Sequence, residues 1–279
     1  MQYRPLSETL PLIKGETLRR LSIPQRNKLP SSVWLSSHHK SGTVWLRRQI
    51  MSILRPYGWS LERVRSPDEI YERFGQSDIP MFSDKREGTQ RVYFDAHSST
   101  PIPPFVETGI HLIRNPREII RSGVLYHRIT HEAWAHHPLE EFGGQTYQVV
   151  LNQVTDAQAL ILELNYCRST LLTMIERTTR SHPKVKSFKY ETLTALKEKE
   201  LADLLKKACF PLLEIDVIAK RLASVNQSRE MLRDLKRPKE RRHFSQNIGQ
   251  KPVWTDEAEE ALNDIMGEWL TDWYPQNGC

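Results

Sequence analysis

The amino-acid sequence predicts an α/β fold in which helices flank a central parallel sheet. Strand-like runs near residues 33–37, 91–97, 109–114 and 184–190 alternate with helical stretches, and this alternation is typical of parallel sheets. The chain has 279 residues, of which 38% are hydrophobic, and a chain of that length can bury one sizeable core. We therefore expect a single domain over residues 1–279.

Charge and cysteine content limit the function classes. The 40 Lys and Arg residues outnumber the 34 Asp and Glu residues by a dispersed excess, giving a net charge of +6; this suits an anionic ligand but lacks the concentrated basic stripe of a nucleic-acid-binding surface. Cys167, Cys209 and Cys279 are too few and too far apart for a disulfide framework or a cysteine metal site. No apolar run is long enough to span a bilayer, and residues 1–30 lack a signal-peptide core. We expect a cytoplasmic protein without nucleic-acid or membrane partners.

The first strand leads into a loop that we interpret as an anion-binding site. Residues 33–35 read as the end of a buried strand, and from Thr43 onward the apolar positions follow a helical period. The first N–H groups of a helix lack internal partners, and the helix dipole adds a partial positive charge there. A phosphate bound at Ser41, Gly42 and Thr43 would accept hydrogen bonds from these N–H groups and would be attracted by the partial charge. Lys40 adds a full positive charge. The expected buried stripe of the helix comprises Val44, Leu46, Ile50, Met51, Ile53 and Leu54.

The order of residues in this loop differs from that of nucleotide kinases. The Walker A pattern places its lysine after the second glycine, whereas Lys40 precedes Ser41-Gly42-Thr43. Residues 39–45, HKSGTVW, instead resemble the PKSGTTW loop of the cytosolic sulfotransferase family, which binds the donor 3′-phosphoadenosine 5′-phosphosulfate (PAPS). The resemblance implies a sulfotransferase fold related to the P-loop kinases. It also implies donor contacts from Lys40, Ser41, Gly42, Thr43, Val44 and Trp45, with Trp45 stacking on the adenine.

A second motif supports the first. Residues 111–122, HLIRNPREIIRS, are similar to the family's LRNPxDxxxS segment. Pro116 suits the first position of a helix, and Glu118 favours a helix start. Arginine offers a planar fork that matches phosphate oxygens, and a serine two turns into the helix can donate a further hydrogen bond. The resemblance implies that Arg114 and Ser122 hold the 3′-phosphate of the donor, and we expect them to face one anion.

Between the two motifs, a third segment suggests a general base. Residues 91–101, RVYFDAHSSTP, look like the family's KTHLP segment, whose histidine takes the proton of the acceptor hydroxyl. His97 occupies the matching place, and an unperturbed imidazole pKa of about 6.5 suits a base at neutral pH. Asp95 stands where the family usually has a lysine, so this carboxylate could contact a cationic acceptor.

Two looser resemblances complete the expected donor site. Residues 185–191, VKSFKYE, look like the strand that ends in the family's YED, which implies that Tyr190 touches the adenine. The family's carboxyl-terminal RKGxxGxW signature is absent, but Arg241 and Arg242 lie near Gly249 and could supply charge to the 3′-phosphate. The resemblance as a whole covers residues 33–250.

The segment after the second motif is helical and rich in histidine. We expect the longest helical stretch from about Gln145 to Arg180. His127 and His131 have helical i, i+4 spacing, but without an HExxH pattern we assign them a structural or acceptor-pocket role rather than a metal site. Residues 127–145 could form a flap over the acceptor. The positions of this helical stretch that we expect in the core are Val149, Val150, Leu160, Ile161, Leu164, Leu171, Leu172 and Ile175.

These observations together predict a PAPS-dependent sulfotransferase. It would move a sulfonate to a hydroxyl or amine of a small-molecule acceptor, such as a secondary metabolite, and release 3′-phosphoadenosine 5′-phosphate (PAP), without requiring a metal. Lys40 would stabilise the leaving oxygen and His97 would accept the acceptor's proton. Two alternatives stay open: a nucleotide-dependent kinase with a degenerate P-loop, for which Asp95 is the candidate magnesium ligand, and a non-catalytic protein that binds PAP or PAPS.

Overall fold

A five-stranded parallel sheet forms the centre of the computed structural model, which describes residues 29–30, 32–64, 91–103, 106–180, 182–235 and 250–275. The strand order is β2-β3-β1-β4-β5, and every pair of neighbours is parallel. This confirms the predicted α/β fold. The strands are β1 (Ser32–Ser37), β2 (Ser60–Arg63), β3 (Arg91–Asp95), β4 (Thr108–Ile113) and β5 (Val185–Lys189).

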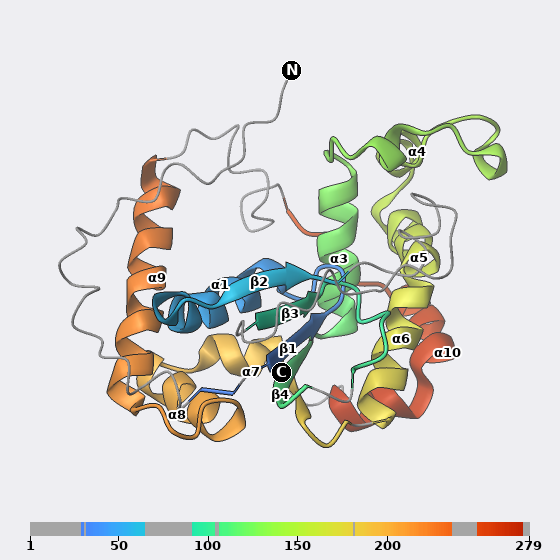
Figure 1. The fold of residues 1–279 in the computed structure, drawn as a ribbon. Coiled ribbons are helices and arrows are strands. Elements are labelled where there is room, and N and C mark those ends of the chain that lie inside the picture. Colours follow the sequence, from blue (N-terminus) through green and yellow to red (C-terminus); the bar gives the residue numbers. More distant parts are fainter. Residues whose placement is uncertain are drawn as a thin grey trace, which may run out of the picture.

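Two groups of helices flank the sheet (Figure 1). The first is α1 (Thr43–Leu54), α8 (Glu198–Ala208) and α9 (Ile215–Leu235), which share a buried cluster with β1, β3 and β4. The second group packs around Ile113 at the end of β4. It consists of α3 (Pro116–His127), α4 (Tyr147–Gln153), α5 (Asp156–Tyr166), α6 (Arg168–Thr179) and α10 (Asp256–Trp273). The shorter elements are α7 (Tyr190–Ala195) and the 3₁₀ turns η2 (Arg55–Tyr57), η3 (Ala133–His136) and η4 (Glu140–Phe142).

The stretch over 145–180 is helical as expected, but it is divided into the three helices α4, α5 and α6. Thr146 caps α4, and Thr155 caps α5 in a capping box with Gln158. Such caps favour a new helix start over continuation. Leu160 and Leu171 are fully buried as expected, but two other expected core positions are exposed by 41% and 46%, namely Val149 and Leu172.

The sheet has a switch point between β1 and β4. From β1 the chain leaves towards β2, whereas from β4 it leaves towards β5 on the other side. In parallel sheets the crevice beyond the carboxyl ends of two such strands is a common binding site. Ser37 pairs with Leu112 in the register of these strands, so the loops of both predicted motifs begin side by side.

None of the described helices combines the length and the hydrophobicity that crossing a bilayer would need.

Candidate active site

The hydroxyl groups of Ser41 and Thr43 stabilise the loop of residues 38–42, which we call the grip loop. Ser41 Oγ donates to the His38 carbonyl and accepts from the His38 amide, both at 2.8 Å. Thr43 Oγ1 donates to the same carbonyl at 3.0 Å and accepts from Ser37 Oγ at 3.0 Å. The two hydroxyls therefore stabilise the loop, and the backbone amides are left as the groups best placed to bind an anion.

The amino terminus of α1 provides those amides. Gly42 occupies the N-cap position without a side-chain cap, and the first turn contains no acidic residue. The dipole and the first amides of α1, from Thr43 onward, are therefore not compensated by a nearby carboxylate. Val44 is 49% exposed, so its expected place in the buried stripe was wrong, and it lies instead at the open side of this helix start.

Gly42 is required by both its backbone and its surroundings. Its φ of 98° lies in the left-handed region, which glycine adopts without steric cost. A Cβ at this position would lie 2.4 Å from Cδ2 of Tyr190. The glycine thus allows the loop backbone to approach an aromatic ring.

Tyr190, Trp45 and Arg114 gather beside Gly42 from three different elements. The Tyr190 ring contacts the Trp45 ring edge-on, with centroids 5.8 Å apart. The Arg114 guanidinium carbon lies 5.1 Å from the centroid of the Tyr190 ring. The structure therefore brings together three residues that the sequence assigned to the donor.

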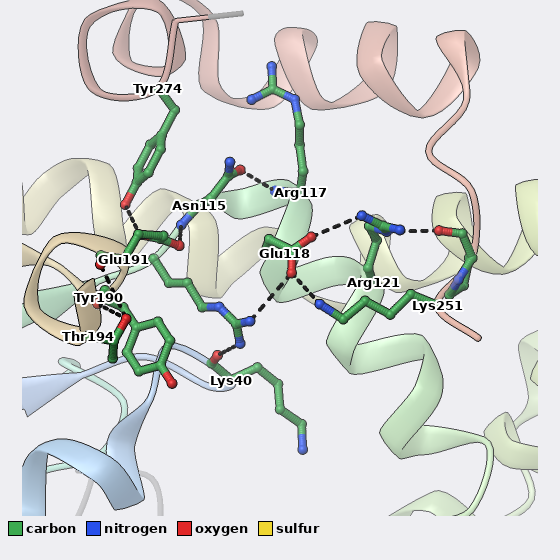
Figure 2. Close-up of polar contacts among 12 residues, drawn as sticks. Lys40, Asn115, Arg117, Glu118, Arg121, Tyr190, Glu191, Thr194, Lys251 and Tyr274 are labelled. Atoms are coloured by element: carbon green, nitrogen blue, oxygen red, sulfur yellow. Dashed lines mark hydrogen bonds and ion pairs between the residues drawn. The ribbon is translucent and has the colours of Figure 1, made fainter. Parts of the chain in front are cut away.

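Lys40 links the two motifs through its backbone. Its carbonyl oxygen accepts a hydrogen bond from Arg114 Nη1 at 2.8 Å (Figure 2). Its Nζ turns the other way and lies 2.9 Å from the centroid of the Tyr126 ring. Burial lowers the pKa of Lys40 to about 7, although Glu132 and Glu163 oppose the shift. Near pH 7 the Lys40 amine is therefore only partly protonated, and a bound anion would favour its charged form.

The carboxylate of Glu118 contacts three cationic side chains, one of which is Arg114 (Figure 2). Its carboxylate contacts Arg114 at 3.5 Å, Arg121 at 3.0 Å and Lys251 Nζ. Burial alone would raise the pKa of Glu118, but the hydrogen bond and charge of Lys251, together with the two arginines, lower it below its ordinary value. Sequence reasoning missed Arg121 and Lys251, because no local pattern marks Lys251 as a neighbour of this helix.

The other residues predicted to bind the 3′-phosphate are Ser122, Arg241 and Arg242. Ser122 is buried in α3 with 1% exposure, and the described contacts of Arg114 lead to Lys40, Glu118 and Tyr190 rather than to Ser122. Their joint contact with one anion stays a prediction. Arg241 and Arg242 lie outside the described residues.

Glu191 positions the turn that carries Arg114. It follows Tyr190 in α7, and its carboxylate accepts from the Asn115 amide at 2.9 Å and from the Tyr274 hydroxyl at 3.3 Å (Figure 2). Asn115 in turn caps α3 through the Arg117 amide. The end of β5, the second motif and α10 are therefore joined at one carboxylate.

Asp95 shapes its own loop. It is buried with 2% exposure, and its two oxygens accept from the amides of His97 at 3.1 Å and Thr100 at 2.9 Å. These bonds argue against the contact with a cationic acceptor that the sequence suggested, and equally against a magnesium-ligand role. Arg177 on α6 donates to the Ser98 carbonyl at 2.8 Å and holds the same loop from outside.

His97, the expected base, is exposed on this loop. Ser98 next to it donates to the Ser37 carbonyl at 2.9 Å, which places the loop against the end of β1. The charge of His97 is also among the causes that lower the pKa values of His38 and His39, after burial and nearer charges. His97 therefore lies near the grip loop, although no described contact orients its ring.

Two buried histidines connect the first residue of the grip loop, His38, to strands β4 and β5. Nε2 of His38 and Nε2 of His111 are 2.7 Å apart, and Nδ1 of His111 lies 3.0 Å from Ser187 Oγ. Because two protonated imidazoles could not share such a contact, at least one ring is neutral. Burial, followed by nearby charges, lowers the pKa of His38 well below its ordinary value and that of His111 to about 3. The pair is thus a neutral support for the ends of β1 and β4.

The state of Lys40 gives a prediction about proton uptake. With a pKa of about 7, the free amine is mostly neutral at about pH 8.5, and a bound phosphate would favour the charged form. We expect PAP binding at that pH to take up about one proton, measured by titration calorimetry in buffers of different ionisation enthalpy. Lys40→Met should bind PAP without this uptake. An equal uptake in both proteins would assign the proton to another group.

Comparison with known proteins supports the fold. The mouse sulfotransferase SULT7A1 complexed with PAP matches with a TM-score of 0.50 and 19% identity over 90% of this chain and 88% of that chain. Retinol dehydratase in complex with androsterone and the inactive cofactor PAP gives a TM-score of 0.47 and 14% identity over 86% of this chain and 82% of that chain. No protein-family model and no curated protein sequence matches the chain. The five-stranded sheet and its helices therefore have the fold of the sulfotransferases.

Proposed function

We propose that the chain is a PAPS-dependent sulfotransferase that acts on a hydroxyl or amine of a small-molecule acceptor. The observation that supports this most is the uncapped start of α1 at the switch point of the sheet, with Lys40, Arg114 and Tyr190 around it. An anionic adenine nucleotide fits such a site, because it needs amides, cations and aromatic rings at once.

The donor would lie along the residues that the two motifs supply. The amides from Thr43 to Trp45 would hold the 5′-phosphate, and Trp45 with Tyr190 would contact the adenine. Arg114, with Ser122, would bind the 3′-phosphate. Among the described residues, Arg114 Nε is buried without a hydrogen-bond partner, and this unused donor is consistent with an anion at that place.

The same arrangement suggests how the residues would promote transfer. Lys40, recharged by the donor, would stabilise negative charge on the oxygen that leaves the sulfur, an electrostatic contribution that is often worth about 10²–10³ in turnover. His97 would accept the proton of the acceptor. No step in this scheme requires a metal, and the neighbours of Asp95 give no support to the kinase alternative.

The direct test is to incubate the protein with sulfur-labelled PAPS and a panel of phenols and amines, with a chelator present. Labelled sulfated product is expected. Magnesium-dependent consumption of ATP instead would favour the kinase alternative, and tight PAP binding without transfer to any acceptor would favour a non-catalytic binding protein.

Arg114→Ala gives a narrower prediction for the donor site. Because charged hydrogen bonds to phosphate are strong, we expect the Kd for PAP to rise by about 10- to 100-fold while that for 5′-AMP changes little. The measurement is calorimetric binding of both nucleotides. Arg180→Ala, which changes an arginine side chain that is 81% exposed just after α6, is the matched control. An equal loss for the two nucleotides would contradict a role in reading the 3′-phosphate.

A further inference from the structure

A buried carboxylate and a buried imidazole near Lys40 have no role in the proposed transfer. His127 ends α3, and its Nδ1 lies 2.8 Å from Oε2 of Glu163 on α5, with both side chains 0% exposed. The same oxygen accepts from the Tyr147 hydroxyl at 2.9 Å, and Oε1 accepts from Cys167 Sγ at 3.2 Å. Glu163 is therefore fixed by three donors, and it fixes His127 in turn.

The helix that carries His127 makes room for this carboxylate. A Cβ at Gly123 would lie 2.1 Å from Oε1 of Glu163, so a larger residue at this position of α3 would displace the carboxylate from its hydrogen bonds. Glycine inside a helix costs about 1 kcal/mol relative to alanine, and a buried ionised carboxylate has a further desolvation cost. Apolar side chains in place of Glu163 and His127 would avoid both costs. Buried ionisable groups that are retained at such a cost are concentrated at functional sites.

The contact with Glu163 determines where a proton can be accepted. Both Glu163 oxygens already accept hydrogen bonds, from Tyr147 and Cys167. In the tautomer that fits this carboxylate, Nδ1 of His127 donates to Glu163 and Nε2 carries the lone pair. Among the described residues, this Nε2 is buried and has no hydrogen-bond partner. A carboxylate on Nδ1 also stabilises the imidazolium that forms when Nε2 accepts a proton, as in the serine hydrolases.

This imidazole lies directly beside the grip loop. Its ring stacks on the ring of His39, with centroids 5.3 Å apart and planes 9° apart, and His39 precedes Lys40. Tyr126, the residue before His127, supports the Lys40 amine. By comparison, His97 is exposed and no described carboxylate contact orients its ring.

Aromatic rings enclose the other sides of His127. The centroids of Trp134, Tyr166 and Tyr147 lie 5.0, 5.3 and 5.9 Å from that of His127. Trp134 and Tyr166 stack on each other at 4.9 Å, and Tyr166 is 45% exposed. A flat aromatic acceptor that displaces the rings of Trp134 and Tyr166 would bring its hydroxyl to Nε2 of His127. Its ring would then pack against the remaining aromatic side chains.

We propose that His127, oriented by Glu163, takes the place of His97 as the base that deprotonates a phenolic acceptor; this inference rests on the sulfotransferase function proposed above. The acceptor's O–H bond breaks and its proton goes to Nε2 of His127. The phenolic oxygen forms a bond to the sulfur of PAPS, and the bond from sulfur to the bridging oxygen breaks, with its electron pair leaving on PAP. The imidazolium beside Glu163 later returns its proton to water.

The test compares two acceptors that differ in their need for a base. At about pH 8.5, phenol keeps its proton, whereas 4-nitrophenol is ionised because its nitro group makes the hydroxyl acidic. His127→Asn keeps an N–H that can donate to Glu163 but removes the basic Nε2. Transfer of labelled sulfonate to phenol should fall by about 10²–10⁴, transfer to 4-nitrophenol by less than about tenfold, and PAP binding should not change. His182→Asn, which alters a partly buried histidine outside residues 127–145, should behave as the parent.

Each other outcome has a defined meaning. Unchanged transfer to phenol, or equal losses with both acceptors, would overturn the role of His127 as the base, and a selective loss in His97→Asn alone would give that role to His97. If His127→Asn fails to fold, as judged by lost PAP binding, Glu163→Gln should show the selective loss with the shape of the pair retained, and its absence would overturn the proposal. A parent protein that binds no PAP or transfers no sulfonate would contradict the proposed function itself, and the inference with it.

Discussion

Replacing Lys40 with alanine is expected to lower the turnover number for sulfonate transfer by about 10²–10³ while PAP still binds. The Lys40 amine lies over the ring of Tyr126, and burial lowers its pKa to about 7. In the proposed mechanism, an anionic donor would recharge this amine, which would then stabilise the leaving oxygen. Steady-state kinetics and PAP calorimetry on the same variant separate the two effects.

The control for this change is Lys184→Ala, which removes an exposed lysine and should leave both quantities unchanged. Lys40→Arg should recover only part of the lost turnover, because a guanidinium keeps the charge but has a different shape. A turnover number for Lys40→Ala equal to that of the parent protein would remove Lys40 from the proposed chemistry.

Gly42→Ala is expected to weaken PAP binding by about 10- to 100-fold. Alanine at a φ of 98° strains the backbone by about 1–3 kcal/mol, and its Cβ would lie 2.4 Å from Tyr190. The ring must move, so both the phosphate amides and the adenine contact would be disturbed. The measurement is calorimetric binding of PAP, with the melting temperature recorded alongside to separate loss of the site from loss of the fold.

Gly144→Ala is a matched control for that prediction. Gly144 has a φ of 83°, and a Cβ there would meet nothing within 4 Å. It therefore carries a similar backbone penalty without the collision with Tyr190. If the two variants bound PAP equally well, the close approach of Gly42 to Tyr190 would not matter to the donor site.

The parts of the fold that the sequence predicted are those with local signals. The buried runs of β1 and β4 and the start of α1 at Thr43 are visible as apolar segments and helix patterns. β2 was missed because its four residues, SLER, lie at the sheet edge and show no apolar run. The three-helix division of 145–180 depends on caps at Thr146 and Thr155, which compete with an otherwise continuous helical pattern.

The candidate site likewise contains residues that local sequence patterns predicted and residues that they did not. Lys40, Gly42 and Arg114 belong to motifs and were predicted as a set. Lys251 approaches Glu118 across 133 positions of sequence, and His127 meets Glu163 across 36. No periodicity records such pairings, because they depend on how α3, α5 and the segment before α10 pack. The two roles suggested for Asp95 stay predictions, and sequence alone did not indicate that its carboxylate accepts hydrogen bonds from two amides of its own loop.

Calorimetric binding of PAP, with 5′-AMP and ATP as comparisons, tests the central claim most directly. A donor site built on the grip loop and Arg114 should bind PAP much more tightly than 5′-AMP, because only PAP carries the 3′-phosphate, and it should not favour ATP. Absence of PAP binding, or tighter binding of ATP than of PAP, would contradict the assignment of this chain as a PAPS-dependent sulfotransferase.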